Sequence, residues 1–450
     1  MNIKEIQIDN LFNDLSIKLP LKESSNISIL YGPNGLGKTT LLTMIDALFN
    51  MRPTVLEEIP FTRFYVAMTN GEKLQLIKKN NTVRTTRNYL HGHIKSQIRS
   101  MELMLTDAKG RSIAIDFASA FTVSISRYGL PTWYKQIDVN IWLDRRTGER
   151  RTTEQLAARY PQLRNEMESL ASEQVKIDAV KRFLLENRVC FIDTQRLVDK
   201  PRERARDVDE EIQEAQVLAV EKCSQKLMAR ISRVSLEYAT KSQSLERTFP
   251  HRLLGHRNSY KRTRQLLSKL YEQEEYRKEL FLLGLAPESH GLGELKDPPP
   301  EFRKVLSLFV KDTDEKLKVY QDLHGKVKLF MGMISRRFAS KTMRISAANG
   351  IQFYGKKGTL IPLRKLSSGE QHELVILYNL LLEMSPRTCV LIDEPEISLH
   401  VCWQEEFLKD LQGIADLVQH NFLIATHSPS IINGHWELGV ELRDDKNTAN

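Results

Sequence analysis

The stretch NISILYGPNGLGKTTLLTMIDALF, residues 26–49, decides the fold of this 450-residue chain. NISILY is a short apolar run bounded by a polar stretch and a glycine, which predicts a buried strand. The loop GPNGLGKT fits the pattern G-x-x-x-x-G-K-[ST], and LLTMIDALF predicts a helix directly after it. A strand, this loop and a helix in that order are the context in which the pattern grips phosphates. The segment therefore predicts an α/β fold with a nucleotide site.

The loop supplies the groups that a nucleotide phosphate requires. Its glycines allow backbone N–H groups to point inward, and the helix N-terminus adds a partial positive charge. We expect Lys38 to reach the β- and γ-phosphates and the hydroxyl of Thr39 to ligate Mg²⁺. The predicted nucleotide-binding residues of this segment are Gly32, Pro33, Asn34, Gly35, Leu36, Gly37, Lys38, Thr39 and Thr40.

Two further apolar runs near the other end of the chain stop at residues that suit the same chemistry. TCVLIDEPE, residues 388–396, predicts a strand that ends at Asp393, for Mg²⁺, and Glu394, which can polarise the attacking water. NFLIATHSP, residues 421–429, predicts a strand that ends before His427. Ligands collect at the carboxyl ends of parallel strands, so His427 is a candidate γ-phosphate sensor, with a structural histidine as the alternative. Lys38, Glu394 and His427 are the predicted catalytic residues.

A second segment typical of a phosphate-binding turn, LSSGEQ at residues 366–371, precedes another predicted helix. Together with the P-loop, VLIDEPE and THS, it resembles the motif set of the ABC-type ATPases, which include Rad50, the SMC proteins and OLD. The resemblance covers both ends of the chain well and the middle poorly. It implies ATP and Mg²⁺ as cofactors and an ATPase that works as a head-to-tail homodimer, with higher oligomers left open. In that dimer Ser367, Ser368, Gly369 and Glu370 would contact the ATP held by the facing subunit.

The long interval between the motifs divides into an enlarged first lobe and a helical insertion. We expect residues 1–200 to form an N-terminal lobe with an antiparallel sheet, 201–340 a helical or coiled-coil hairpin, and 341–450 a C-terminal lobe. RVCFIDTQRL, residues 188–197, predicts a strand followed by a polar turn. The resemblance implies that Gln195 in this turn contacts Mg²⁺ and the γ-phosphate, whereas an ordinary solvated turn is the alternative.

Apolar positions from Val208 to Tyr238 recur in steps of three and four, which predicts one long amphipathic helix. Pro250 is expected to end it. The apolar stripe must be buried, either against a hairpin partner around residues 266–280 or against another chain. In the second case Ile231 and Val234 would lie in an interface.

DEPEISLH resembles soluble prokaryotic ATPases related to Rad50 and OLD. Stand-alone ATPases of this kind resemble the ATPase subunits of anti-phage systems, PtuA of Septu and AriA of PARIS, and the sequence does not choose between them. That resemblance implies an ATP-controlled scaffold for a separate nuclease or toxin subunit, with DNA or a phage-derived trigger as open partners. The alternative is a DNA-repair ATPase like RecF or Rad50 that acts on DNA directly, through basic clusters such as Arg145–Arg151. The inserted helices disfavour a transporter subunit.

Composition restricts the setting of these activities. A formal net charge of +9 permits an acidic partner such as nucleic acid. Four scattered cysteines form no CxxC pair, which predicts a reducing cytoplasm and no disulfide framework. No apolar run reaches the roughly 18 residues of a membrane span, so we expect no membrane partner.

Overall fold

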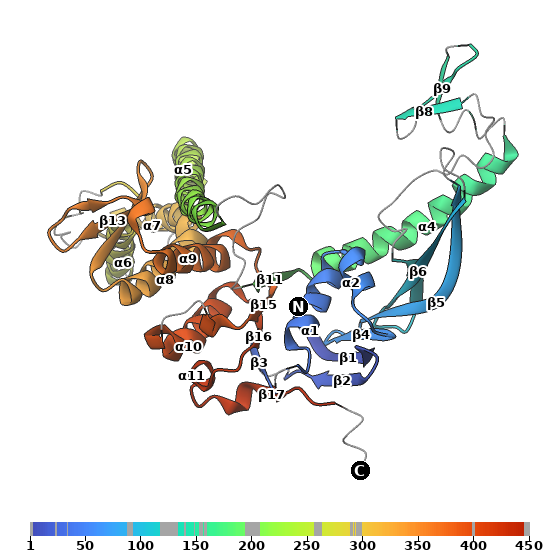
Figure 1. Cartoon of the computed structure of the whole chain (residues 1–450). Helices are drawn as coiled ribbons and strands as arrows, with labels where there is room; N and C mark the ends of the chain where they lie inside the picture. Colours follow the sequence, from blue (N-terminus) through green and yellow to red (C-terminus); the bar gives the residue numbers. More distant parts are fainter. Residues whose placement is uncertain are drawn as a thin grey trace. The chain divides into compact units, whose positions relative to one another are not determined.

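The computed structural model contains two compact units (Figure 1). Unit 1 comprises Met1–Ile192, Arg387–Glu394 and Asn421–Asn450, and unit 2 comprises Asp193–Pro386 and Pro395–His420. The structure describes residues 3–22, 25–33, 35–87, 93–117, 134–138, 141–147, 149–152, 156, 160–193, 208–255, 263–288, 291, 293, 299–397 and 401–444.

A five-stranded sheet with the order β11-β15-β16-β3-β17 forms the centre of unit 1. Its strands are β3 (Ile27–Tyr31), β11 (Val189–Asp193), β15 (Cys389–Asp393), β16 (Asn421–Ala425) and β17 (Gly439–Glu441). β15, β16, β3 and β17 pair in parallel, and α1 (Lys38–Phe49) packs against β15 and β16. β3, β15 and β16 are buried along most of their length, as near-continuous apolar strands should be. The strands predicted from these three apolar runs are confirmed.

An antiparallel sheet with the strand order β2-β1-β4-β5-β6-β7 forms the second layer of unit 1. Its strands are β1 (Ile3–Leu11), β2 (Leu15–Pro20), β4 (Arg63–Met68), β5 (Lys73–Arg87), β6 (His93–Thr106) and β7 (Ser112–Asp116). The remaining elements of the lobe are α2 (Pro53–Glu58), β8 (Tyr134–Asp138), β9 (Ile141–Asp144), β10 (Arg150–Thr152) and α4 (Pro161–Glu186). One hydrophobic core joins Ile6 and Leu103 of this sheet to Leu30 and Leu391 of the parallel sheet. The expected antiparallel sheet is confirmed.

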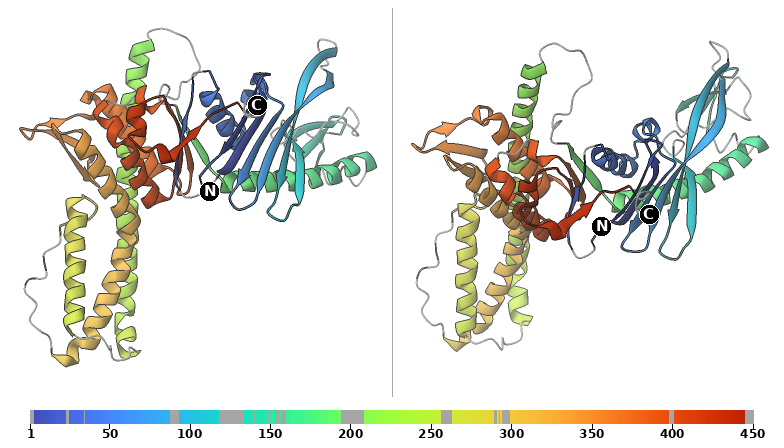
Figure 2. Two further views of the ribbon diagram at one scale, coloured as in Figure 1. Left: turned by 90° about the horizontal axis from the view of Figure 1, so that it is seen from below. Right: turned by 60° about the horizontal axis from the view of Figure 1, so that its bottom comes forward.

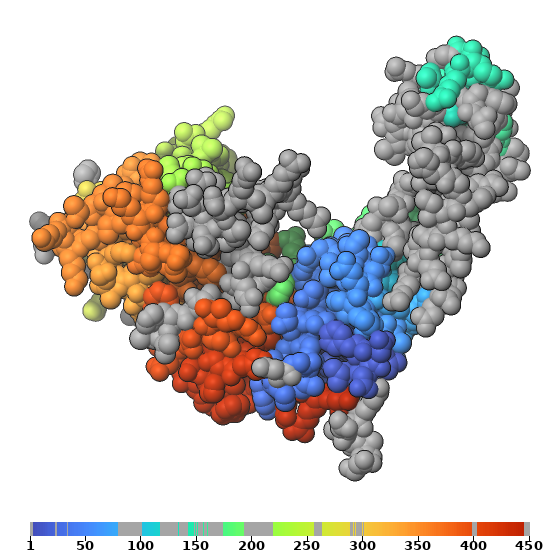
Figure 3. All heavy atoms as spheres, viewed as in Figure 1, coloured from blue at the N-terminus to red at the C-terminus, as the bar shows by residue number. Residues whose placement is uncertain are grey.

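The C-terminal segment returns to the N-terminal strands within unit 1. Leu442 N–H donates to Tyr31 O at 2.9 Å, and Ser16 N–H donates to the Asp444 carboxylate at 3.1 Å. In the space-filling view dark red C-terminal atoms border the blue N-terminal ones (Figure 3). The short helices α11 (Pro429–Ile432) and η7 (Trp436–Leu438) precede this return. Both ends of the chain therefore build unit 1.

Unit 2 is mostly helical, with long helices lying side by side (Figure 2). Its helices are α5 (Val208–Gly255), α6 (Thr263–Leu282), η2 (Pro300–Phe302), α7 (Arg303–Leu317), η3 (Lys318–Tyr320), α8 (Gln321–Arg337), η4 (Leu363–Lys365), α9 (Ser368–Tyr378), the π-helix η5 (Asn379–Glu383), η6 (Pro395–Ile397) and α10 (Val401–Val418). β12 (Lys341–Ser346), β13 (Gly350–Gly355) and β14 (Leu360–Ile361) form a small antiparallel sheet. α7 contacts both α5 and α6, so the insertion is a packed helical body.

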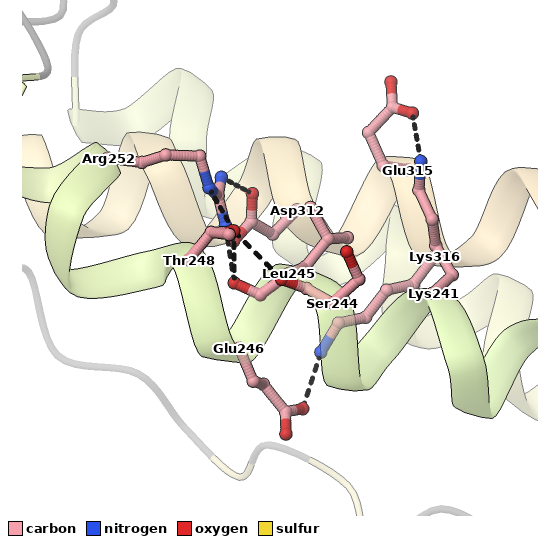
Figure 4. Close-up of polar contacts among 9 residues, drawn as sticks. All are labelled: Lys241, Ser244, Leu245, Glu246, Thr248, Arg252, Asp312, Glu315 and Lys316. Carbon is pink, nitrogen blue, oxygen red and sulfur yellow. Dashed lines mark hydrogen bonds and ion pairs between the residues drawn. The ribbon is translucent and has the colours of Figure 1, made fainter.

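Helix α5 does not end at Pro250, and that prediction is wrong. The helix continues through the proline to Gly255. Polar contacts tie this last part of α5 to its own backbone and to α7 (Figure 4). Arg252 Nη2 donates to Leu245 O at 2.7 Å, and Thr248 Oγ1 donates to Ser244 O at 3.0 Å. The Arg252 guanidinium also forms two bonds to Asp312 of α7, at 2.5 and 2.7 Å.

Four residues in the centre of the apolar stripe of α5 are buried inside unit 2. Ile231 is 1% exposed, and Val220, Cys223 and Leu227 are also buried, because α5 packs against α7, α9 and β13. Val234 is half-buried. The expectation that Ile231 could belong to an interface with another chain is therefore wrong, since its side chain is already covered by its own chain.

Candidate functional site

The predicted phosphate loop leaves β3 at Tyr31 and enters α1 at Lys38 in unit 1. Gly37 caps α1 with φ +82°, and a Cβ at this residue would lie 3.1 Å from Leu11 Cδ2. Glycine is thus required here for both backbone angle and space. The Lys38 side chain folds over the loop, and its ammonium donates to Gly32 O at 2.8 Å and to Pro33 O at 3.0 Å.

The other residues of the loop differ in their exposure. Thr39 and Gly35 are exposed, whereas Thr40 is half-buried at the start of α1. Leu36 packs against the core of unit 1, which ties the loop to the sheet. Asn34 lies outside the described residues. The hydroxyl of Thr39 is accordingly presented at the surface beside a helix N-terminus whose first turn holds no acidic residue.

The two carboxylates of DEPE stand at the carboxyl end of β15. Asp393 pairs in register with Ala425 of β16, and Glu394 follows it with φ +44°. A non-glycine residue in this left-handed region is uncommon and is found at functional sites. The Glu394 N–H donates to Ala425 O at 2.8 Å, which holds the turn in place. Both side chains are half-buried.

His427 follows β16, the strand between β15 and β3. Its ring is exposed, and the preceding Thr426 is fully buried, with its Oγ1 accepting the Ser428 N–H at 2.9 Å. Because Asp393, Ala425 and Leu30 are aligned across three adjacent parallel strands, the loop, Glu394 and His427 emerge at one edge of the sheet. The structure therefore brings together in unit 1 three motifs that are far apart in the sequence.

The LSSGEQ motif forms a rigid turn at the N-terminus of α9 in unit 2. Ser367 and Glu370 make a capping box: Glu370 N–H donates to Ser367 Oγ at 3.3 Å, and Ser367 N–H donates to Glu370 Oε2 at 2.8 Å. The buried Gln371 donates to Leu366 O at 3.1 Å and holds the preceding loop. Ser367, Ser368 and Gly369 are exposed.

Glu370 is engaged within its own chain. Its Oε2 accepts a hydrogen bond from Lys341 Nζ at 2.6 Å. Burial raises the pKa of Glu370, but the bonds from Lys341 and from the Ser367 N–H outweigh burial and lower the pKa below its usual value. The carboxylate therefore fixes the serines of the turn in addition to any contact with a nucleotide.

Some predicted contacts gain no support. Gln195 lies outside the described residues. In the basic cluster Arg145–Arg151, Arg146 lies 3.5 Å from the Asp144 carboxylate and Arg151 lies 2.6 Å from that of Glu149. Both arginines therefore have a carboxylate partner within the cluster.

Sequence reasoning missed a buried ionic cluster beneath the α9 turn. Arg337 at the end of α8 pairs with Glu373 of α9 and lies 2.5 Å from the carboxylate of Asp410 in α10. All three side chains are 4% exposed or less. In the sequence, the only signal for this cluster is that Glu373 and Asp410 are charged residues on otherwise apolar helix faces.

The groups at the edge of the parallel sheet fit a magnesium nucleotide. A lysine ammonium, a helix N-terminus and a hydroxyl follow β3, and two carboxylates follow β15. Phosphate groups prefer the ammonium and the helix N-terminus, whereas Mg²⁺ prefers the hydroxyl and carboxylate oxygens. These residues, on a parallel sheet with an antiparallel lobe and a helical insertion, define a P-loop ATPase head of the ABC type.

A family model described as AAA ATPase domain matches residues 1–432. The chain belongs to this family and is an ATPase. No curated protein matches the chain. No helix in the part of the chain that the structure describes is long and apolar enough to cross a membrane.

The solved structures to which the chain is similar include two Smc heads. An Smc head domain with an extended coiled coil, bound to the C-terminal domain of ScpA, from Pyrococcus furiosus, has a TM-score of 0.34 at 12% identity and covers 98% of this chain and 94% of that one. An Smc head domain with a coiled coil and joint, from Pyrococcus yayanosii, has a TM-score of 0.30 at 14% identity and covers 98% and 95%. The fold assignment therefore rests on the strand order and the family match.

Proposed function

We propose that two copies of this chain hydrolyse ATP at composite sites, each made from the phosphate loop of one copy and the LSSGEQ turn of the other. The observation behind this proposal is the exposed turn of Ser367, Ser368 and Gly369 at the N-terminus of α9, an 11-residue helix. Such an N-terminus presents backbone N–H groups and partial positive charge to an anion. The capping box and Gln371 fix this turn in advance, so little ordering would be required on binding.

In this proposal each residue at the sheet edge has one task. Lys38 would neutralise the β- and γ-phosphates, and Thr39 and Asp393 would hold Mg²⁺, which supplies further positive charge when bound. Glu394 accepts the proton of the attacking water. His427, exposed at the same edge, contacts the γ-phosphate.

Mixing two inactive variants tests the composite site. Ser367→Arg places a long cation in the facing site, and Lys38→Ala removes the charge on the phosphates. Each homodimer should be inactive, whereas a mixed dimer has one site with both lesions and one with neither. We expect hydrolysis to recover partly on mixing. Ser232→Arg, which adds the same charge at an exposed residue of α5 in unit 2, is the matched control and should keep full activity.

The mixing result is decisive in both directions. Subunit exchange is measured separately, by pull-down between differently tagged variants. Exchange without recovered hydrolysis would refute the trans arrangement. Recovery in the mixture, with none in either variant alone, supports it.

We further propose that ATP occupancy or turnover controls a separate nuclease or toxin subunit, as in the Septu and PARIS systems. The support is the motif style of DEPEISLH together with the helical insertion. Co-expression with the product of the adjacent gene, followed by size determination and DNA and RNA cleavage assays, tests this proposal. Metal-dependent cleavage by the isolated chain, lost on mutation outside the ATP residues, would refute it.

A further inference from the structure

Lys341, the first residue of β12, is bonded to the LSSGEQ turn within unit 2. Its ammonium donates to Glu370 Oε1 at 2.5 Å and to Glu370 Oε2 at 2.6 Å. The Lys341 side chain is 18% exposed and that of Glu370 is 17% exposed, so solvent and salt screen this ion pair less than a surface pair. One ammonium therefore holds both carboxylate oxygens of a residue in the first turn of α9.

Glu370 places a negative charge in the turn that the proposed composite site presents to a phosphate. Burial raises the pKa of this carboxyl, but the bonds from Lys341 and Ser367 hold the pKa below its usual value, so the carboxylate is charged at neutral pH. The hydrogen bond from the Ser367 N–H at 2.8 Å does not remove that charge, because an amide is neutral. Like charges repel each other, so an unbalanced Glu370 would oppose the phosphate that the helix N-terminus attracts.

Lys341 is the cation that balances this carboxylate. Among the residues that the structure describes, it is the only one that forms an ion pair with Glu370. Arg364 and Lys365, in η4 just before the turn, are exposed, and no ion pair joins either of them to Glu370 in the described part of the chain. Once Lys341 balances Glu370, Arg364 and Lys365 leave the segment around the turn with a net positive charge, which suits a phosphate.

We propose that Lys341 is a positioning residue for ATP hydrolysis in the facing subunit, and that it acts by balancing the charge of Glu370 and holding that residue in the capping box. This inference rests on the proposed composite site. Removal of Lys341 should therefore damage the ATP site to which its own turn contributes, and leave the phosphate loop of its own copy intact. Glutamine also completes a capping box but carries no charge, so Glu370→Gln removes the need for a balancing cation.

Steady-state hydrolysis and equilibrium ATP titration of the full chain test the charge balance. Lys341→Met should lower turnover about tenfold, the scale of a lost charge-assisted bond, and change ATP affinity little because the phosphate loop is untouched. Lys341→Arg should retain most of the turnover, since a guanidinium can also bond both oxygens. Adding Glu370→Gln to Lys341→Met should restore most of the turnover. Lys357→Met removes an exposed lysine from the turn after β13 in the same small sheet, and this control should match the wild type.

Rescue by Glu370→Gln separates charge balance from a purely structural role. If Lys341 only supported the fold of unit 2, the double variant would be no more active than Lys341→Met. That result, or wild-type turnover in Lys341→Met, overturns the proposal. Thermal unfolding of each variant is measured alongside. If Lys341→Met alone does not fold, the double variant decides: turnover near that of the wild type supports the proposal, and a slow or unfolded double variant overturns it.

Mixed dimers show in which site Lys341 acts. Lys341→Met mixed with Lys38→Ala forms dimers in which one site carries both lesions and the other neither, so hydrolysis should rise above the sum of the separate rates. When Lys341→Met is mixed with Ser367→Arg, both sites of the dimer contain an altered turn, and no such rise is expected. The mixture of Ser367→Arg with Lys38→Ala is run in parallel. If that mixture recovers hydrolysis but Lys341→Met with Lys38→Ala does not, only the role of Lys341 fails; if neither mixture recovers although subunits exchange, the composite site fails as well.

Discussion

Replacing Arg337 by methionine should destabilise unit 2 by about 3–5 kcal/mol, the usual cost of removing one member of a buried ion pair. The Arg337 side chain is 3% exposed, and its partners Glu373 and Asp410 are 4% and 3% exposed. Removal of the guanidinium leaves Glu373 without its cation and leaves Asp410 with only Arg336, which is 46% exposed. Methionine fills a volume similar to that of arginine. The loss of stability is therefore caused by the missing charge and hydrogen bonds more than by a cavity.

The loss of stability should depend on pH with a defined sign. Burial raises the pKa of Glu373, and Arg337 partly opposes this rise. A carboxyl whose pKa is higher in the folded state stabilises that state below its unfolded pKa, and this contribution is lost as pH rises through the folded pKa. Without Arg337 the pKa of Glu373 rises further. Arg337→Met should therefore be destabilised more at about pH 7.5 than at about pH 5.

Thermal and urea unfolding of the full chain, followed by circular dichroism at both pH values, measures this effect. Arg336→Met is the control, because its exposed guanidinium should contribute at most about 1 kcal/mol. Arg337→Met combined with Glu373→Leu and Asp410→Leu should recover much of the loss, since an apolar replacement leaves no buried charge. A cost of Arg337→Met below about 1 kcal/mol, or one independent of pH, would refute the reasoning.

The remaining predictions concern the sheet edge in unit 1. Lys38→Ala should weaken ATP binding about a hundredfold in equilibrium titrations, because it removes the only ammonium on the phosphate loop; affinity equal to the wild type would contradict the assignment. Glu394→Gln should retain ATP binding and slow steady-state hydrolysis about a hundredfold or more, since an amide cannot accept the proton of water. Gln occupies the same φ of +44° at the same cost as Glu, so an unchanged rate would exclude Glu394 as the base.

The part of the site that follows the parallel strands could be predicted from the sequence because each motif is local. A strand, a loop and a helix N-terminus are contiguous in GPNGLGKTT, and the carboxylates of DEPE directly follow their own strand. Parallel pairing then aligns Asp393, Ala425 and Leu30, so three local predictions become one site without further information. The positive φ of Glu394 was not predictable, since nothing in its residue type requires it.

The interior of unit 2 could not be predicted in the same way because its contacts are distant in sequence. The turn of α5 beyond Pro250 is contacted through Arg252 by Asp312, which lies on another helix. The burial of Ile231 likewise depends on α7 and α9, so periodicity revealed a buried face but not its partner. A hydrophobic stripe defines which residues are covered, whereas the covering surface is a property of the whole fold.

Glu370 shows how a motif residue can fix the geometry of its own turn. The family resemblance groups it with Ser367, Ser368 and Gly369 as nucleotide-binding. In this structure Glu370 Oε2 accepts the Ser367 N–H at 2.8 Å, and the Lys341 ammonium donates to Oε2 at 2.6 Å and to Oε1 at 2.5 Å, so both oxygens are engaged within unit 2. The lowered pKa of Glu370 keeps the carboxylate charged at neutral pH, which strengthens both bonds. The motif therefore divides into residues that present a surface and one that fixes the geometry of that surface. A glutamate suits the second task because its side chain completes the capping box and its charge also pairs with Lys341.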